Sequence, residues 1–211
     1  MKKLSRIFGG RPPPVIGDRN ALASFIDGNS AFVAQTTLYG YIKTRAGLEY
    51  FRLFEEADFV ASVNIAKWNI YATCVGDLTL FCGAHICNQT ETECLADYLL
   101  ECMELIFSRH GHPPDAGEDY LSLSQTACER IKTATDWHAD ERAFSESPKS
   151  LVYWAPVADG HKQYDAHIVQ NSIIFKWKET RDKFRRQADI SALVKGIEQL
   201  SAEKSDVSPA L

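Results

Sequence analysis

The stretch FVASVNIAKWNIYATCVGDLTLFCGAHIC, residues 59–87, is apolar on almost every side and contains no proline. Between Ile70 and Cys87 the only acidic or basic side chains are those of Asp77 and His85. An apolar run of helical length without a polar face is typical of a helix buried on most sides. The stretch therefore predicts the central helix (59–87) of an all-α fold, a single irregular bundle of about six or seven helices.

The same stretch also raises the alternative of a membrane span, which needs about 20 predominantly apolar residues. Asp77 would then lie near the centre of the bilayer, at a cost of about 2.5–3.5 kcal/mol on insertion scales. Asn64, Lys67 and Asn69 shorten the apolar run further. These polar residues favour the core of a bundle over a transmembrane helix.

Composition restricts the class of protein. With 211 residues and 45% hydrophobic content, the chain can bury one sizeable core. The net charge of −5 argues against nucleic acid as a partner, because nucleic-acid binding requires a strongly basic face. Six cysteines without a signal-peptide pattern predict reduced thiols and a cytoplasmic location.

The chain divides into three parts. We expect residues 1–14 to form a flexible, basic and proline-rich lead, residues 15–200 a single helical domain, and residues 201–211 a disordered polar tail. Leu4, Ile7 and Phe8 lie beside basic residues, a pattern that also suits a short anchor on an anionic membrane. Because so short a helix is marginal in water, a frayed terminus is favoured.

Helix boundaries are marked most clearly after the lead. Asp18 suits an N-cap, and apolar residues recur at three- and four-residue steps until Gly47, which suits the C-terminal cap. Gly28 and Gly40 interrupt this helix, each at a cost of about 1 kcal/mol relative to alanine. Gly28 is therefore the expected position of a kink or break.

Later helices follow from similar signals. Asp58 is expected to cap the central helix, and Thr90 with Glu93 forms a capping box ahead of the next one. Further helices are expected within 119–144, from Asp165 to Gln187 and from Ile190 to Leu200.

Asp77 is the sharpest anomaly, because a carboxylate in an apolar run must be paired, protonated or beside a cavity. One hypothesis makes Asp77 and His85 ligand-binding residues, with His85 or an arginine from another helix as the partner of Asp77. The alternative is structural, either a hydrogen bond to another helix or a helix break at Gly76. The structural alternative is favoured because ion pairs also occur in protein cores.

Cysteines surround His85 in the sequence. Cys74, Cys82 and Cys87 supply, with His85, the ligand types that zinc and iron prefer. The paired spacing of a structural zinc site is absent, and free cysteine commonly fills cores as a small hydrophobe. We therefore predict no metal and no cofactor, and keep a metal-dependent or small-molecule enzyme at this place as the alternative function.

Motifs of the common enzyme classes are missing. The chain contains no H-E-x-x-H, G-x-S-x-G, G-x-x-x-x-G-K-[ST] or G-x-G-x-x-G and no paired E-x-x-H. We predict no catalytic residue, which favours a non-enzymatic protein. A weaker hypothesis is a carrier of an apolar ligand with a cavity beside Gly76 and Gly83.

Between Ile174 and Arg186 the chain reads IFKWKETRDKFRR, with six basic residues against two acidic ones and aromatic residues interleaved. A helix of this kind docks on an acidic protein or on an anionic membrane surface. The candidate partner-binding residues are Lys176, Trp177, Lys178, Arg181, Lys183, Arg185 and Arg186. The alternative is a solvated face, or one paired with the acidic helix of residues 91–104.

The segments RPPPVIGD (11–18) and TLYGYIKTRAG (37–47) resemble the opening of a small family of bacterial helical proteins. The resemblance includes no catalytic motif. Taken together, the sequence predicts a non-enzymatic interaction or adaptor protein, in the cytosol or peripheral to the inner membrane surface. Its partner is an unknown protein or an anionic membrane surface.

Overall fold

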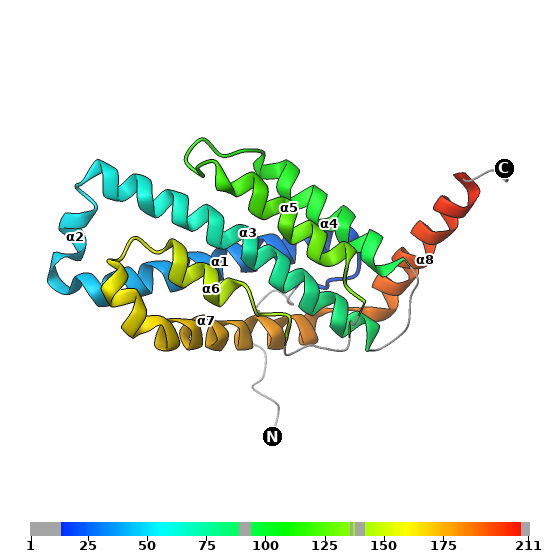
Figure 1. Ribbon diagram of the computed structural model, residues 1–211. Coiled ribbons are helices and arrows are strands. Elements are labelled where there is room, and N and C mark those ends of the chain that lie inside the picture. The colour runs from blue at the N-terminus through cyan, green and yellow to red at the C-terminus, as the bar shows by residue number, and fades with distance from the viewer. Residues whose placement is uncertain (1–13, 89–93, 136, 138–141, 208–211) are drawn as a thin grey trace, which may run out of the picture.

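The structure is a computed structural model that describes residues 14–88, 94–135, 137 and 142–207 (Figure 1). Its elements are α1 (Arg19–Ala46), the 3-10 turn η1 (Gly47–Glu49), α2 (Tyr50–Leu53), α3 (Ala57–Cys87), α4 (Leu95–His110), α5 (Asp119–Lys132), α6 (Ser147–Trp154), α7 (Asp159–Gln187) and α8 (Ile190–Val207). Among the described residues, strand-like pairing is limited to one isolated bridge between Ile16 and Ala188. The all-α prediction is confirmed.

The helix α3 is the centre of the bundle. It packs most extensively against α1 and α5, and also against α6 and α4, so that Figure 1 shows it crossing the molecule among the other helices. Val63, Ile70 and Phe81 are buried. By length and composition α3 could cross a membrane, but 78% of its apolar window is buried inside the bundle. This burial gives α3 the surroundings of a core helix.

The first helix has the predicted ends. The Asp18 carboxylate accepts a hydrogen bond from the Ala21 N–H at 2.8 Å, and Gly47 follows the helix with φ of 54°. A positive φ favours glycine, which has no Cβ to clash with its own backbone. The expected break at Gly28 is absent, because α1 continues through it and through Gly40.

Several other boundaries differ from the prediction. The central helix begins at Ala57 with Glu56 at the cap position, so Asp58 lies in its first turn and is not the cap. The helix expected from Asp165 begins earlier, at Asp159. The last helix runs to Val207, so the prediction of a disordered tail is wrong for residues 201–207. Residues 1–13, the capping box at Thr90 and Glu93, and residues 208–211 lie outside the described residues.

The helices α1 and α7 run antiparallel along one side of the bundle, since the first half of α1 faces the second half of α7. Their ends are tied together next to the start of α8. The Ile16 N–H donates to the Gln187 carbonyl at 2.9 Å, and the Asp189 N–H donates to the Ile16 carbonyl at the same distance. This backbone tie fixes the chain that leads into α1 against the end of α7.

Candidate functional site

Asp77 is fully buried and joins three helices. Arg130 of α5 places its Nη1 atom 2.8 Å from Asp77 Oδ1, and the Ser147 N–H at the start of α6 donates to Oδ2 at 2.7 Å. Burial raises the pKa of Asp77, while Arg130 and Ser147 act in the opposite direction. The carboxylate also faces the N-terminus of α6, where the helix dipole favours negative charge.

Asp77 has the arginine partner from another helix that the ligand-binding hypothesis named, together with the hydrogen bond to another helix that the structural alternative named. The break at Gly76 is absent, because α3 continues through it. His85 lies two turns away on α3 and packs elsewhere, with its ring centroid 6.2 Å from that of Phe81 and 5.6 Å from that of Phe184. The structure therefore does not bring the two predicted ligand-binding residues, Asp77 and His85, into one site.

The cysteines near His85 are not gathered into a cluster of metal ligands within the described residues. Over the part of the chain that the structure describes, no group of three or more His, Cys, Asp or Glu side chains is arranged to hold a metal ion. Burial raises the pKa of the Cys74 and Cys82 thiols well above the ordinary value. A buried, protonated thiol is a poor ligand and a poor nucleophile. All six cysteines lie among the described residues, and none is in a disulfide.

The cavity suggested beside Gly76 and Gly83 is occupied by protein. A Cβ on Gly83 would meet the ring of Trp137 at 2.3 Å and Leu99 at 2.7 Å, and one on Gly76 would meet Ala127 at 3.0 Å. Both glycines instead permit close packing of neighbouring elements onto α3. This contact removes the basis for an apolar-ligand cavity at that place.

The basic and aromatic residues of α7 are divided among its faces. Trp177 is fully buried, and its Nε1–H donates to the Ser147 hydroxyl at 3.0 Å, so its assignment to partner binding is wrong. Arg181 lies over the Phe144 ring, and Arg185 over the Phe81 ring. Arg181 is half-buried, whereas Arg185 remains exposed.

The other basic residues of the segment remain accessible. Lys178 and Arg186 are exposed, and Lys176 and Lys183 are half-buried on the side of α7 that faces α1. Lys176 lies over the Phe32 ring at 5.4 Å, and Lys183 lies over the Phe25 ring at 5.7 Å. These cation–π contacts place the ammonium groups of both lysines over aromatic rings of α1.

The acidic helix α4 does not neutralise these cations. Glu101 pairs with Arg19 of α1, and Asp97 pairs with Lys204 of α8 at 2.6 Å. The alternative in which the basic and acidic helices lie side by side as ion-pair partners is therefore wrong for these two acids. Arg185 of α7 lies 3.5 Å from Asp182 on the same helix. Among the described residues, no carboxylate lies within ion-pair distance of Lys176, Lys178, Lys183 or Arg186.

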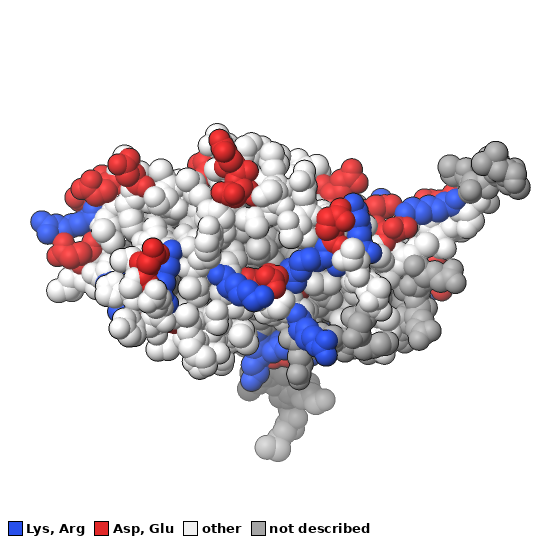
Figure 2. Space-filling view, in the orientation of Figure 1, with Lys and Arg blue, Asp and Glu red and all other residues white. Residues whose placement is uncertain are grey.

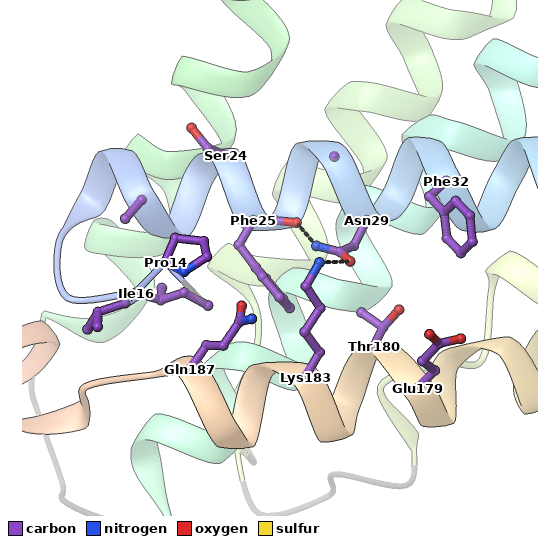
Figure 3. A pocket seen from close by; sticks show the side chains of 13 residues that line it. Pro14, Ile16, Ser24, Phe25, Asn29, Phe32, Glu179, Thr180, Lys183 and Gln187 are labelled. Carbon is purple, nitrogen blue, oxygen red and sulfur yellow. Dashed lines mark hydrogen bonds between the residues drawn. The ribbon is translucent and has the colours of Figure 1, made fainter. Parts of the chain in front are cut away.

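Two of these cations, Lys183 and Lys176, line a groove between α1 and α7. Its first part is a pocket of about 600 Å³ between the first half of α1 and the second half of α7. Figure 3 shows Lys183 extending from α7 toward Asn29 of α1, where its Nζ donates to Asn29 Oδ1 at 3.2 Å. The Asn29 amide in turn donates to the Phe25 carbonyl at 2.6 Å. The Gln187 Oε1 atom lines the same pocket and is buried without a hydrogen-bond partner among the described residues.

The second part of the groove is a larger and more apolar pocket of about 890 Å³ between the second half of α1 and the first half of α7. Ile168 and Phe175 line it and are 72% and 73% exposed. Phe32 belongs to the first pocket and Lys176 to the second, so their contact joins the two parts. We call the surface formed by the lining residues of both pockets the α1–α7 groove.

An ion-pair network lines the second pocket near the C-terminal end of α1. The Arg45 guanidinium forms hydrogen bonds with the Asp165 carboxylate, and the Tyr41 hydroxyl donates to Asp165 Oδ2 at 2.9 Å. Hydrogen bonding to Arg45 lowers the pKa of Asp165. Burial and the bond to Asp165 raise the pKa of Tyr41 to about 12. This network joins α1 to α7 at this part of the groove.

The α1 side of the groove was missed at the level of sequence. Gly28 and Gly40, which the sequence marks as costly interruptions, both line the groove, and a Cβ on either would meet nothing within 4 Å. Because the two glycines have no side chain, the groove is shallower at these positions, and no neighbouring residue occupies the free space. Glycine at two solvent-facing helix positions was the available signal, because helix propensity disfavours it there.

A second polar cluster was also missed. Asp27 of α1 accepts hydrogen bonds from the Tyr71 hydroxyl at 2.8 Å, and its Oδ1 lies 2.9 Å from His110 Nε2. Arg109 lies 3.9 Å from the other carboxylate oxygen. The groups that surround Asp27 come from α3 and α4, so we interpret the cluster as a cross-link among three helices.

Comparison with known proteins gives no match, since no family model, no curated protein and no solved structure is significantly similar to this chain. The resemblance to a bacterial family therefore gains no support, and the fold and the α1–α7 groove are the only basis for a functional conclusion.

Proposed function

We propose that this protein is a non-enzymatic helical interaction protein that binds an acidic, apolar-faced segment of a partner protein in the α1–α7 groove. The observation that carries the proposal is the combination of exposed apolar side chains, Ile168 and Phe175, with the groove cations Lys176 and Lys183. Neither cation has a carboxylate within ion-pair distance among the described residues, and the one acidic residue that lines the first pocket is Glu179. A segment with carboxylates beside an apolar face would match both properties.

The energetics of such docking are favourable. Covering a large apolar side chain contributes about 1.5–3 kcal/mol, and two such side chains are exposed in the second pocket. Gly28 and Gly40 let another backbone approach α1 closely. Helix-in-groove recognition uses these features, with apolar anchors for affinity and charges for orientation and rate.

The concave shape favours a protein segment over a flat membrane surface. The two pockets lie between helices, and a bilayer headgroup region would contact their rims rather than their floors. Reduced thiols suit a protein of the cytosol or of the inner membrane surface, which is where we place the interaction. Binding to an anionic membrane is the competing possibility that the experiment below distinguishes.

The test uses two synthetic amphipathic peptides of identical apolar face, one with glutamates and the other with lysines on its flanks. We expect the glutamate peptide to bind, with an affinity that falls as salt is raised, because the groove cations are screened. Isothermal titration calorimetry measures both affinities. The reversal Lys176→Glu with Lys183→Glu should abolish binding of the glutamate peptide.

A matched control is the double reversal Lys149→Glu with Lys178→Glu, which changes the same charge outside the groove. This control should retain most of the affinity. Equal binding of the two peptides, or no loss in the groove variant, would contradict the proposal. Binding to anionic vesicles without binding to the glutamate peptide would identify a membrane surface, and not a protein, as the partner.

A further inference from the structure

The end of the bundle formed by η1 and α2 carries a second unusual surface. Leu48 is 97% exposed and Phe51 is 79% exposed, three residues apart on a tight helical corner. Figure 1 shows that α2 lies at the extreme end of the molecule, beyond the first turns of α3. Two large apolar side chains therefore project where no other described element covers them.

Three exposed carboxylates follow this corner along the chain. Glu55, Glu56 and Asp58 follow it directly and are exposed, while Arg52 within the corner pairs with Glu49 at 3.0 Å. Figure 2 shows acidic side chains at this end with a basic one between them. None of these three has a basic side chain within ion-pair distance among the described residues. We call this surface, made of Leu48, Phe51 and the three carboxylates, the acidic tip.

We propose that the acidic tip of one copy docks in the α1–α7 groove of a second copy. The tip presents apolar side chains flanked by unpaired carboxylates, and the groove presents apolar side chains flanked by the unpaired cations Lys176 and Lys183. The two surfaces thus complement each other in charge and in apolar character. This inference rests on the proposed function of the groove and names its partner.

Each copy carries both surfaces on different elements, so the contact is head-to-tail. A heterologous contact of this kind adds further copies until a ring closes, or continues as an open chain. The position of the tip at the end of the bundle lets it enter a groove on a second copy (Figure 1). The mass of the protein in solution should therefore increase with concentration rather than stop at a fixed dimer formed by one symmetric face.

Sedimentation velocity of the full chain up to about 1 mM provides the test. The tip variant Leu48→Ser with Phe51→Ser and the groove variant Ile168→Ser with Phe175→Ser should each remain monomeric. All four side chains are exposed, so the fold should be retained, which circular dichroism verifies. Tyr153→Ser removes a similarly exposed aromatic residue of α6 and should leave the assembly unchanged.

Mixing the tip variant with the groove variant gives the decisive result. The groove of the first is intact and the tip of the second is intact, so an equimolar mixture should form dimers and nothing larger. A wild-type protein that stays monomeric, a tip variant that assembles like the wild type, or a mixture that stays monomeric would each overturn the inference. The glutamate peptide should still bind the monomeric tip variant, so loss of self-assembly alone leaves the proposed function intact.

Discussion

Asp77 and Lys183 are both ionisable residues placed among apolar side chains, yet their surroundings differ in kind. Asp77 is buried, and its charge is compensated inside the bundle by Arg130 and by an N–H group at the start of α6. Lys183 contacts Asn29 and the Phe25 ring, but no carboxylate among the described residues forms an ion pair with it. A charge compensated inside the fold contributes to architecture, whereas an accessible charge without a partner is available to another molecule.

The largest effect should come from removing the partner of the buried carboxylate. Arg130→Met leaves the Asp77 charge uncompensated, which should lower the free energy of unfolding by about 3 kcal/mol in urea denaturation. Lys183→Met in the groove should change it by less than about 1 kcal/mol. Adding Asp77→Asn to Arg130→Met should recover part of the loss, because no buried charge then remains. Equal losses at both sites would remove the distinction between them.

A glycine in the core and a glycine in the groove allow the same comparison with a smaller expected effect. Gly83→Ala forces Trp137 and Leu99 to move and should destabilise the protein by about 1–3 kcal/mol, measured by thermal unfolding. A variant of unchanged stability would show that the Trp137 ring shifts without cost.

In the groove, replacing glycine by alanine should raise the stability of the protein instead of lowering it. Gly40→Ala has open space around the new methyl group and should stabilise α1 by about 1 kcal/mol. The same variant should bind the glutamate peptide more weakly, because the methyl group raises the groove wall. Stabilisation together with unchanged binding would place the partner away from Gly40.

The smallest effect concerns the pH dependence of the α1–α7 connection. Because Arg45 lowers the pKa of Asp165, the folded state binds fewer protons there than the unfolded state. The stability contributed by this carboxylate is therefore present above its ordinary pKa of 3.8 and is lost as pH falls through the lowered value. Asp165→Asn should flatten the acid side of a stability–pH curve. An unchanged curve would mean that this ion pair does not support the groove.

Prediction from sequence succeeded where one local property decides the structure. The stretch around Ile70 and Phe81 has no polar face, so burial was its only stable environment, and both residues are buried. Asp18 and Gly47 were identifiable as helix ends because capping depends on neighbouring backbone groups alone.

Prediction failed where a residue's role depends on the element packed against it. Trp177 lies in the same basic-aromatic run as Lys176, but one position along a helix rotates the side chain by about 100 degrees, which directs Trp177 into the core. The α1 wall of the groove was missed because no periodic signal in either helix reports which helix lies opposite.

The sequence by itself determined that the chain forms helices, where several of them begin and end, and that residues 59–87 are enclosed. Tertiary structure alone decided which charges are compensated, because an ion pair joins residues far apart in the chain, as Arg130 and Asp77 show. It also decided that the Gly28 and Gly40 positions open outward, since a groove exists only between two packed helices. Helix formation follows from local backbone and side-chain preferences, whereas a binding surface follows from what the rest of the fold leaves uncovered.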